Sequence, residues 1–250
     1  MDYTKKVKSN KEEKMKVTSY KSTLAKLLAE ENLIVEQKKV HTASFDVNSR
    51  ILTLPVFKEN VSNDVVDLFI SHEVGHALET PAVEWMVAVK EVRKSILNVV
   101  EDARIEAFIK RKYPGLKSIH HRAYKELMSV DFFGLSKLEI EELNFVDRLN
   151  LFFKVGFIEN LSFDNKEQKF VDKISNIRTF NDAVLISKEI QKFIEERIES
   201  NKQKYFNEFN SENEDKSEMN EFFEEMDSEN EYDSDVYPSE ENDEFEEDWG

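Results

Sequence analysis

The chain contains no cysteine among its 250 residues, so disulfide bonds and thiolate metal sites are excluded. No stretch approaches the roughly 18 consecutive apolar residues of a membrane span, and we expect no transmembrane helix and no membrane partner. The N-terminal residues are rich in lysine and lack the apolar segment of a secretory signal, which favours a cytoplasmic protein. Glycine and proline number only 5 and 4, which is typical of helices joined by short polar connections.

The negative charge of the chain is concentrated near its C-terminus. The formal net charge is −17, but residues 207–250 alone hold 20 acidic side chains and one basic side chain, Lys216. The first 206 residues have 34 Lys or Arg against 32 acidic residues, and the two signs are interleaved, so we expect no nucleic-acid partner. We interpret residues 1–18 as a flexible basic arm, 19–206 as one folded domain and 207–250 as a disordered acidic tail.

Hydrophobic periodicity predicts an α+β fold that is mostly helical, with a small β-sheet or hairpin. Two short strands, 40–47 and 50–55, flank the turn signal Asn48-Ser49, and Pro55 suits a strand end or a sheet edge. Ser62 or Asn63 is expected to cap the helix that follows the hairpin. Helices are expected at 22–30, 63–78, 83–112 (with a break allowed), 118–128, 136–156, 166–177 and 181–200.

The segment His72-Glu73-Val74-Gly75-His76 carries the most specific chemical signal. His72 and His76 lie one helical turn apart on the same face, so both imidazoles can bind one ion. Glu73 projects beside them and could take a proton from a metal-bound water, whose pKa zinc lowers towards about 7. Gly75 costs about 1 kcal/mol in a helix, which suggests that another backbone approaches closely near the metal. The segment therefore predicts a zinc site with Glu73 as the general base.

A catalytic zinc usually takes a third protein ligand, and the segment 98–106 lies at a suitable distance along the chain. Two adjacent acids compete for this role. Asp102 has Glu106 one turn further on, and Glu106 could orient a histidine from behind. Glu101 lacks that support, but its side chain is longer and glutamate is the commoner third ligand. We favour Asp102 and keep Glu101 as the alternative.

A hydrolase also needs a group that stabilises the oxyanion formed during the reaction. The candidates are Arg104, His120, His121 and Tyr124, and no spacing argument favours any one of them. The His120-His121 pair fits a surface position near a helix start equally well.

Three segments together resemble known sequences, namely TASFDVNSRILTLP, HEVGHALETP and NVVEDARIE. They are similar to a group of metallopeptidases encoded by large tailed bacteriophages, and to the N-terminal metallopeptidase-like region of cobaltochelatase accessory subunits. The resemblance covers roughly residues 20–160. It implies a zincin-like domain with the HExxH motif, zinc as the cofactor, an aspartate ligand at Asp102 and a location in the host cytoplasm.

The resemblance also implies how a substrate would bind. In zincins a strand at a sheet edge runs above the metal and pairs with an extended peptide. The strand just before the metal-binding helix would take this role, through Ile51, Leu52, Thr53 and Leu54. The function expected on these grounds is a zinc-dependent metallopeptidase that hydrolyses peptide bonds in a peptide or protein substrate.

The alternative is a catalytically silent metal-binding scaffold that acts with an ATPase or a von Willebrand factor A-domain partner. In the cobaltochelatase subunits an acidic stretch separates the metallopeptidase-like region from an A domain, and this chain has the acidic stretch without an A domain after it. Acidic tails often contact basic partners, which favours the scaffold. A tail that folds back over the cleft as an autoinhibitor, or that mimics nucleic acid, stays open as well.

Overall fold

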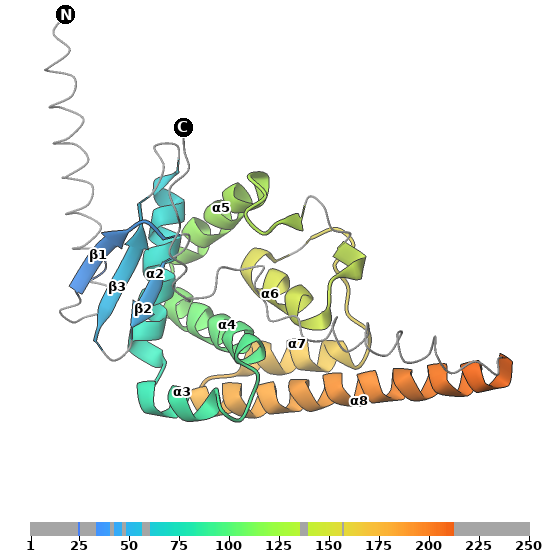
Figure 1. The fold of residues 1–250 in the computed structure, drawn as a ribbon. Helices are drawn as coiled ribbons and strands as arrows, with labels where there is room; N and C mark the ends of the chain where they lie inside the picture. Colours follow the sequence, from blue (N-terminus) through green and yellow to red (C-terminus); the bar gives the residue numbers. More distant parts are fainter. Residues whose placement is uncertain are drawn as a thin grey trace, which may run out of the picture.

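The computed structural model describes residues 25, 34–40, 43–46, 49–56, 61–135, 140–156 and 158–212. The expected basic arm at 1–18, nearly all of the expected helix at 22–30 and residues 213–250 of the expected acidic tail lie outside these residues. In the described part, a small sheet stands beside a larger set of helices (Figure 1). The prediction of a mostly helical α+β protein with a small sheet is confirmed.

The sheet contains three strands in the order β1-β3-β2, with β1 at Ile34–Lys38, β2 at Ser44–Asp46 and β3 at Ile51–Pro55. β2 and β3 pair antiparallel, with Phe45 opposite Leu52, which confirms the predicted hairpin. β1 was not predicted, and it runs parallel to β3 with Val35 opposite Leu52. Leu52 is fully buried, because this face of the sheet packs against the helices.

β3 is the central strand of the sheet, so the expectation that Ile51 to Leu54 forms a substrate-binding edge is wrong. The backbone of β3 is paired with β1 on one side and with β2 on the other. It therefore offers no row of free N–H and C=O groups to which a peptide could add as a further strand. The edges of the described sheet are β1 and β2.

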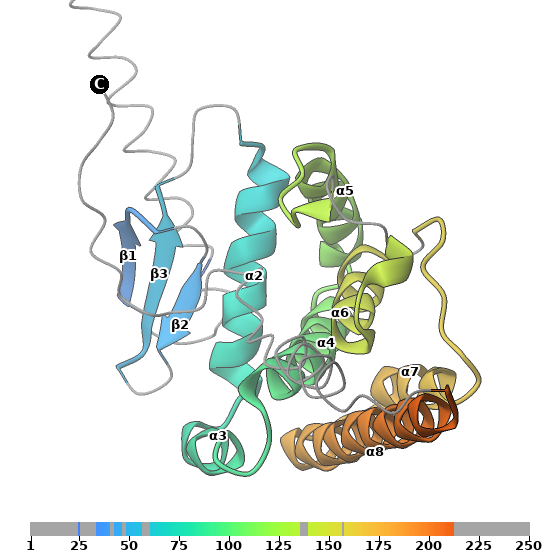
Figure 2. The same ribbon diagram turned by 45° about the vertical axis from the view of Figure 1, so that its right-hand side comes forward.

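Helix α2 (Asn63–Glu79) carries the histidine motif and lies between the sheet and α5 (Leu116–Ser129), with β2 the strand nearest to it (Figure 2). Ser62 caps α2 as predicted, because its hydroxyl accepts a hydrogen bond from the amide of Val65 at 3.3 Å. Pro81 follows directly after the last turn, where the helix was expected to end. Neighbours cover most sides of α2, so its buried residues are spread around it: Val65, Leu68, Ile70, Ser71, Glu73, Val74, Gly75 and Ala77.

The predicted helix at 83–112 is divided into α3 (Ala82–Ala88) and α4 (Lys94–Lys112). The predicted helix at 136–156 is shorter than expected, because α6 runs only from Phe145 to Val155 and follows a 3₁₀ turn at Ile140–Glu142. α7 (Glu167–Asn176) matches its prediction, whereas α8 (Phe180–Glu212) continues well past 200. Residues 207–212, assigned above to a disordered tail, are therefore helical.

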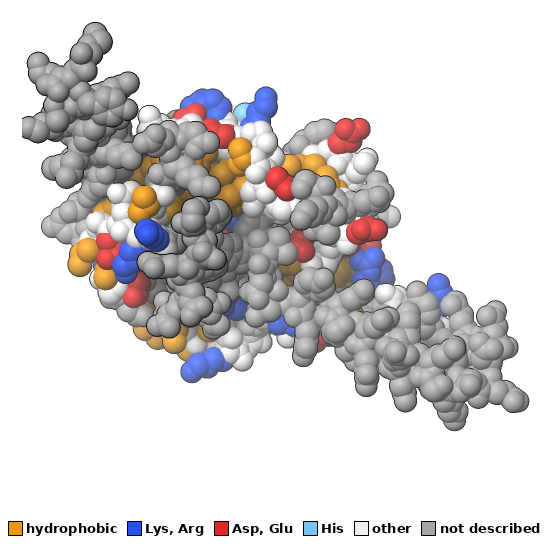
Figure 3. All heavy atoms as spheres, turned by 45° about the horizontal axis from the view of Figure 1, so that its top comes forward, with side chains coloured by type: hydrophobic (Ala, Val, Ile, Leu, Met, Phe, Trp, Pro, Cys, Tyr) orange, Lys and Arg blue, Asp and Glu red, His pale blue; other side chains and the backbone are white. Residues whose placement is uncertain are grey.

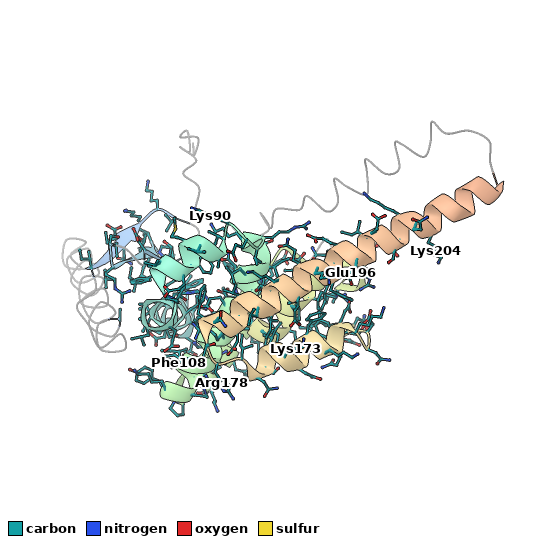
Figure 4. All side chains as sticks on the ribbon, turned by 90° about the horizontal axis from the view of Figure 1, so that it is seen from below. Lys90, Phe108, Lys173, Arg178, Glu196 and Lys204 are labelled. Atoms are coloured by element: carbon teal, nitrogen blue, oxygen red, sulfur yellow. The ribbon has the colours of Figure 1, made fainter. Side chains whose placement is uncertain are left out.

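None of the helices in the described ranges has the length and apolarity needed to cross a bilayer. α7 and α8 run side by side along one side of the molecule, as the labels Lys173 and Glu196 show in Figure 4.

On the face seen in Figure 3, the Lys/Arg and Asp/Glu side chains of the described residues are interspersed. Neither sign of charge forms a continuous patch there.

Three hydrophobic clusters hold the helices together. The first joins α3, α4, α6, α7 and α8, the second joins the sheet to α2 and to the end of α4, and the third joins α2, α5 and α6. Leu97, Leu149 and Ile190 are fully buried in the first cluster. Each of α2, α4 and α6 thus belongs to two clusters, and the candidate site lies where these three helices meet.

Candidate metal centre

Two helices bring two imidazoles and one carboxylate together. The Nε2 atoms of His72 and His76 on α2 lie 3.5 and 3.2 Å from the same oxygen, Oδ1 of Asp102 on α4. One ligand atom from each residue lies within 4.8 Å of the others. The three side chains keep exposed fractions of 14, 18 and 17 %, so an ion held here would be accessible from one side. In the described ranges, this is the one group of His, Asp or Glu side chains that could hold a metal ion.

The other nitrogen of each imidazole is held from behind. His72 Nδ1 lies 3.0 Å from Oε1 of Glu106, and His76 Nδ1 lies 2.9 Å from the hydroxyl of Thr80. These contacts leave both Nε2 atoms turned towards Asp102, which is the arrangement that metal-binding histidines need. Glu106 therefore contacts a histidine from behind, as its i+4 spacing from Asp102 predicted. Thr80 was missed, although it lies at i+4 from His76 on the same helical face.

Glu101, the competing candidate for the third ligand, forms hydrogen bonds to Arg104 and Thr80 instead. Its side chain is fully buried and accepts hydrogen bonds from Nε and Nη2 of Arg104, each at 2.8 Å, and from the Thr80 hydroxyl at 2.5 Å. Glu101 therefore anchors Arg104 and fixes the threonine that holds His76. The structure brings Asp102, and not Glu101, to the histidine pair.

Lys154 on α6 completes the surroundings of Asp102. Its ammonium lies 2.9 Å from Oδ2 of Asp102, the carboxylate oxygen that does not face the histidines. The exposed fraction of the Lys154 side chain is 17 %. No spacing argument pointed to this residue, because α6 reaches the site only through tertiary packing, mainly against α4.

The carboxylate of Asp102 is held in its ionised form. Burial raises the pKa of Asp102, but the positive charges of Lys154 and His72 outweigh burial and hold this pKa well below its ordinary value. Burial lowers the pKa of His72, but the charge of Asp102 and the hydrogen bonds to Asp102 and Glu106 outweigh burial and raise it to about 10. A cation is thus favoured among these side chains, and a metal ion would take the place of the His72 proton.

Glu73 is 8 % exposed and follows His72 on α2. The negative charge of Glu73 adds to the larger effect of Asp102, and together they raise the pKa of His72 and of Lys154 against the effect of burial. The Glu73 carboxylate therefore acts electrostatically on a candidate metal ligand and on the cation beside Asp102.

Gly75 allows α2 and α4 to pack closely, as its cost in a helix suggested. A Cβ atom at Gly75 would lie 2.9 Å from Cδ1 of Ile105 and 3.5 Å from the Ile105 carbonyl oxygen. The approaching group is mainly a side chain, with the backbone just behind it. This close approach brings His72, His76 and Asp102 within reach of one ion.

Three of the four candidates for oxyanion stabilisation have other partners, and the fourth, His121, is exposed. Arg104 donates to Glu79 and Glu101, and Tyr124 donates a short hydrogen bond to Glu106. His120 is buried, with Nε2 at 2.8 Å from the Ser71 hydroxyl, and His121 is exposed on α5. Tyr124 and His120 thus contact Glu106, the carboxylate that holds Nδ1 of His72.

No model of a known protein family, no curated protein and no solved structure matches the chain. What the protein does is therefore inferred from the chemistry of the site.

Proposed function

We propose that the chain is a zinc-dependent metallopeptidase of the zincin type, in which His72, His76 and Asp102 hold zinc and Glu73 is the general base. The observation that carries this proposal is the convergence of two imidazole nitrogens and one carboxylate oxygen. A further acid, Glu73, lies on α2 beside the histidines. Three such ligands with an open position are the usual protein contribution to a catalytic zinc site. Magnesium and calcium prefer sites built from oxygen ligands alone, which these residues do not provide.

The side chains divide the work. Zinc, when bound, would supply an activated water at neutral pH and polarise the carbonyl of the scissile bond. Glu73 would accept the proton of the attacking water and deliver it to the leaving amine. Glu106 and Thr80 hold the two imidazoles from behind, so that the ligand geometry exists before substrate arrives.

The substrate strand is reassigned from β3 to β2. β2 pairs with β3 through one of its sides, and in the described part of the chain no strand pairs with its other side. It is also the strand nearest to α2 (Figure 2). An extended peptide can add to such an edge through backbone hydrogen bonds. We therefore place the peptide along Ser44–Asp46.

The test is the substitution Glu73→Gln, which keeps the size of the side chain and removes its basicity. Zinc-loaded protein is incubated with unfolded casein, and both cleavage and bound zinc are measured. We expect Glu73→Gln to bind zinc as the original chain does and to lose cleavage by at least about 10²-fold, the usual contribution of a general base. Glu84→Gln on α3, an exposed position away from the site, is the matched control and should leave cleavage unchanged.

Unchanged casein cleavage in Glu73→Gln would reject the assignment of Glu73. Zinc bound by the original chain with no cleavage of any peptide would instead favour the scaffold that acts with an ATPase or A-domain partner.

A further inference from the structure

The two carboxylate oxygens of Asp102 have different surroundings. Oδ1 faces the Nε2 atoms of His72 and His76 at 3.5 and 3.2 Å. Oδ2 lies 2.9 Å from the ammonium of Lys154, within the distance of a charge-assisted hydrogen bond. In the described part of the chain, Lys154 is the partner found for Oδ2.

A carboxylate can bind a metal ion through one oxygen or through both. A second oxygen from Asp102 would add a protein ligand atom beside the water, and would fill the fifth coordination position that a catalytic zinc uses in the transition state. The group that holds Oδ2 therefore decides how many positions the protein fills. At Asp102 that group is a cation, which is repelled by a metal ion and does not itself bind one.

Lys154 is well fixed for this role. α6 is anchored on two sides, because Leu149 is buried in the first hydrophobic cluster and Leu151 in the third. Lys154 lies on the helical face between these two leucines, one turn after Asn150, which is 6 % exposed. Its aliphatic stem thus leaves α6 from a packed face and carries the ammonium to Asp102.

We propose that Lys154 is a positioning residue that keeps Asp102 a one-oxygen metal ligand and so leaves the fifth coordination position free for the substrate. This inference rests on the proposed zinc site. It assigns to Lys154 a role in the number of protein ligand atoms, rather than in binding the metal as such.

The experiment uses cobalt(II) as a spectroscopic substitute for zinc in the full chain. Visible absorption of cobalt(II) is intense with four ligands and weaker with five. We compare the original chain, Lys154→Met and Lys154→Arg at saturating cobalt, and measure zinc affinity by competition with a chromophoric chelator. The matched control is Lys173→Met, which removes an exposed lysine of α7 (labelled in Figure 4) that is paired with Glu189 of α8.

In Lys154→Met we expect the visible absorption to fall by about two-fold, because Asp102 adds its second oxygen as a fifth ligand. Zinc affinity should stay within about three-fold of the original value, since a like charge is removed and a ligand atom is gained. Lys154→Arg should restore the original spectrum, and Lys173→Met should not change it.

An unchanged cobalt spectrum in Lys154→Met would overturn the inference. A loss of zinc affinity of more than about 10-fold with an unchanged spectrum would also overturn it, because Lys154 would then only help Asp102 to bind. Failure of the original chain to bind zinc or cobalt would reject the proposed function itself, so the two failures are distinguishable.

Discussion

Converting the carboxylate to an amide should have different effects at the adjacent acids Glu101 and Asp102. At Glu101 it should lower the stability of the protein, whereas at Asp102 it should weaken zinc binding. In Glu101→Gln, the buried guanidinium of Arg104 loses the charge of the carboxylate to which it donates two hydrogen bonds at 2.8 Å. Removing one partner of a buried ion pair costs about 3–5 kcal/mol. Glu79 still accepts from Nη1 of Arg104 at 3.0 Å, so we expect the lower end, about 3 kcal/mol.

For a domain of this size, a loss of about 3 kcal/mol lowers the midpoint of thermal unfolding by about 6–12 °C. Asp102→Asn, at a partly exposed position, should cost about 1 kcal/mol in metal-free protein. It should instead weaken zinc binding by more than about 100-fold. Removing a residue that only orients a metal ligand weakens binding by at most about 100-fold, so a larger loss identifies a ligand. Glu101→Gln should keep zinc binding, because Thr80 still contacts His76.

Both variants are unfolded by heat in the presence of EDTA, and zinc affinity is measured separately at a temperature where each is folded. The reasoning is refuted if Glu101→Gln releases zinc while its unfolding midpoint is unchanged. It is equally refuted if Asp102→Asn binds zinc as the original chain does. Either result would make Glu101 the third ligand.

Two further predictions concern packing and pH. Ile105→Val alone should lower the free energy of unfolding by about 0.5–1.5 kcal/mol. In a Gly75→Ala background it should lower this free energy by less, because it deletes the Cδ1 atom that the new Cβ would meet at 2.9 Å. Equal losses in the two backgrounds would contradict the close approach. The pKa of Asp182 is lowered mainly because the backbone amide of Thr179 donates a hydrogen bond to its Oδ2 at 3.0 Å. The stabilising effect of Asp182 is therefore present above the unfolded pKa and is lost as the pH falls through the folded pKa. Asp182→Ala should thus lower the stability of the protein near pH 7 by less than about 1 kcal/mol, because solvent screens this charge, and by still less below about pH 4. Urea unfolding measures the difference, and a difference that does not change with pH would contradict this.

The elements predicted well from the sequence are those fixed by local signals. α2 begins after the capping residue Ser62 and ends before Pro81, and the β2–β3 hairpin follows from alternation around a turn. β1 was missed because its sequence alternates poorly and its partner, β3, lies more than ten residues further along the chain. Without β1, β3 had the pattern of an edge strand, and the substrate strand was therefore misassigned.

The same division holds at the site. The spacing of His72 and His76 is a property of one helix, and Glu106 follows from its i+4 relation to Asp102. Whether Glu101 or Asp102 faces the histidines depends on the rotation of α4 against α2, which tertiary packing decides. Lys154 comes from a helix that meets α4 only in the folded protein, so no spacing rule could reveal it.

Anomalous diffraction from crystals of the zinc-loaded chain, recorded on both sides of the zinc absorption edge, tests the central claim most directly. We predict one peak bonded to Nε2 of His72, Nε2 of His76 and Oδ1 of Asp102, at about 2.0–2.2 Å from each. A zinc peak bonded to Glu101 in place of Asp102, or no peak at the histidine pair in protein shown to contain zinc, would contradict the account.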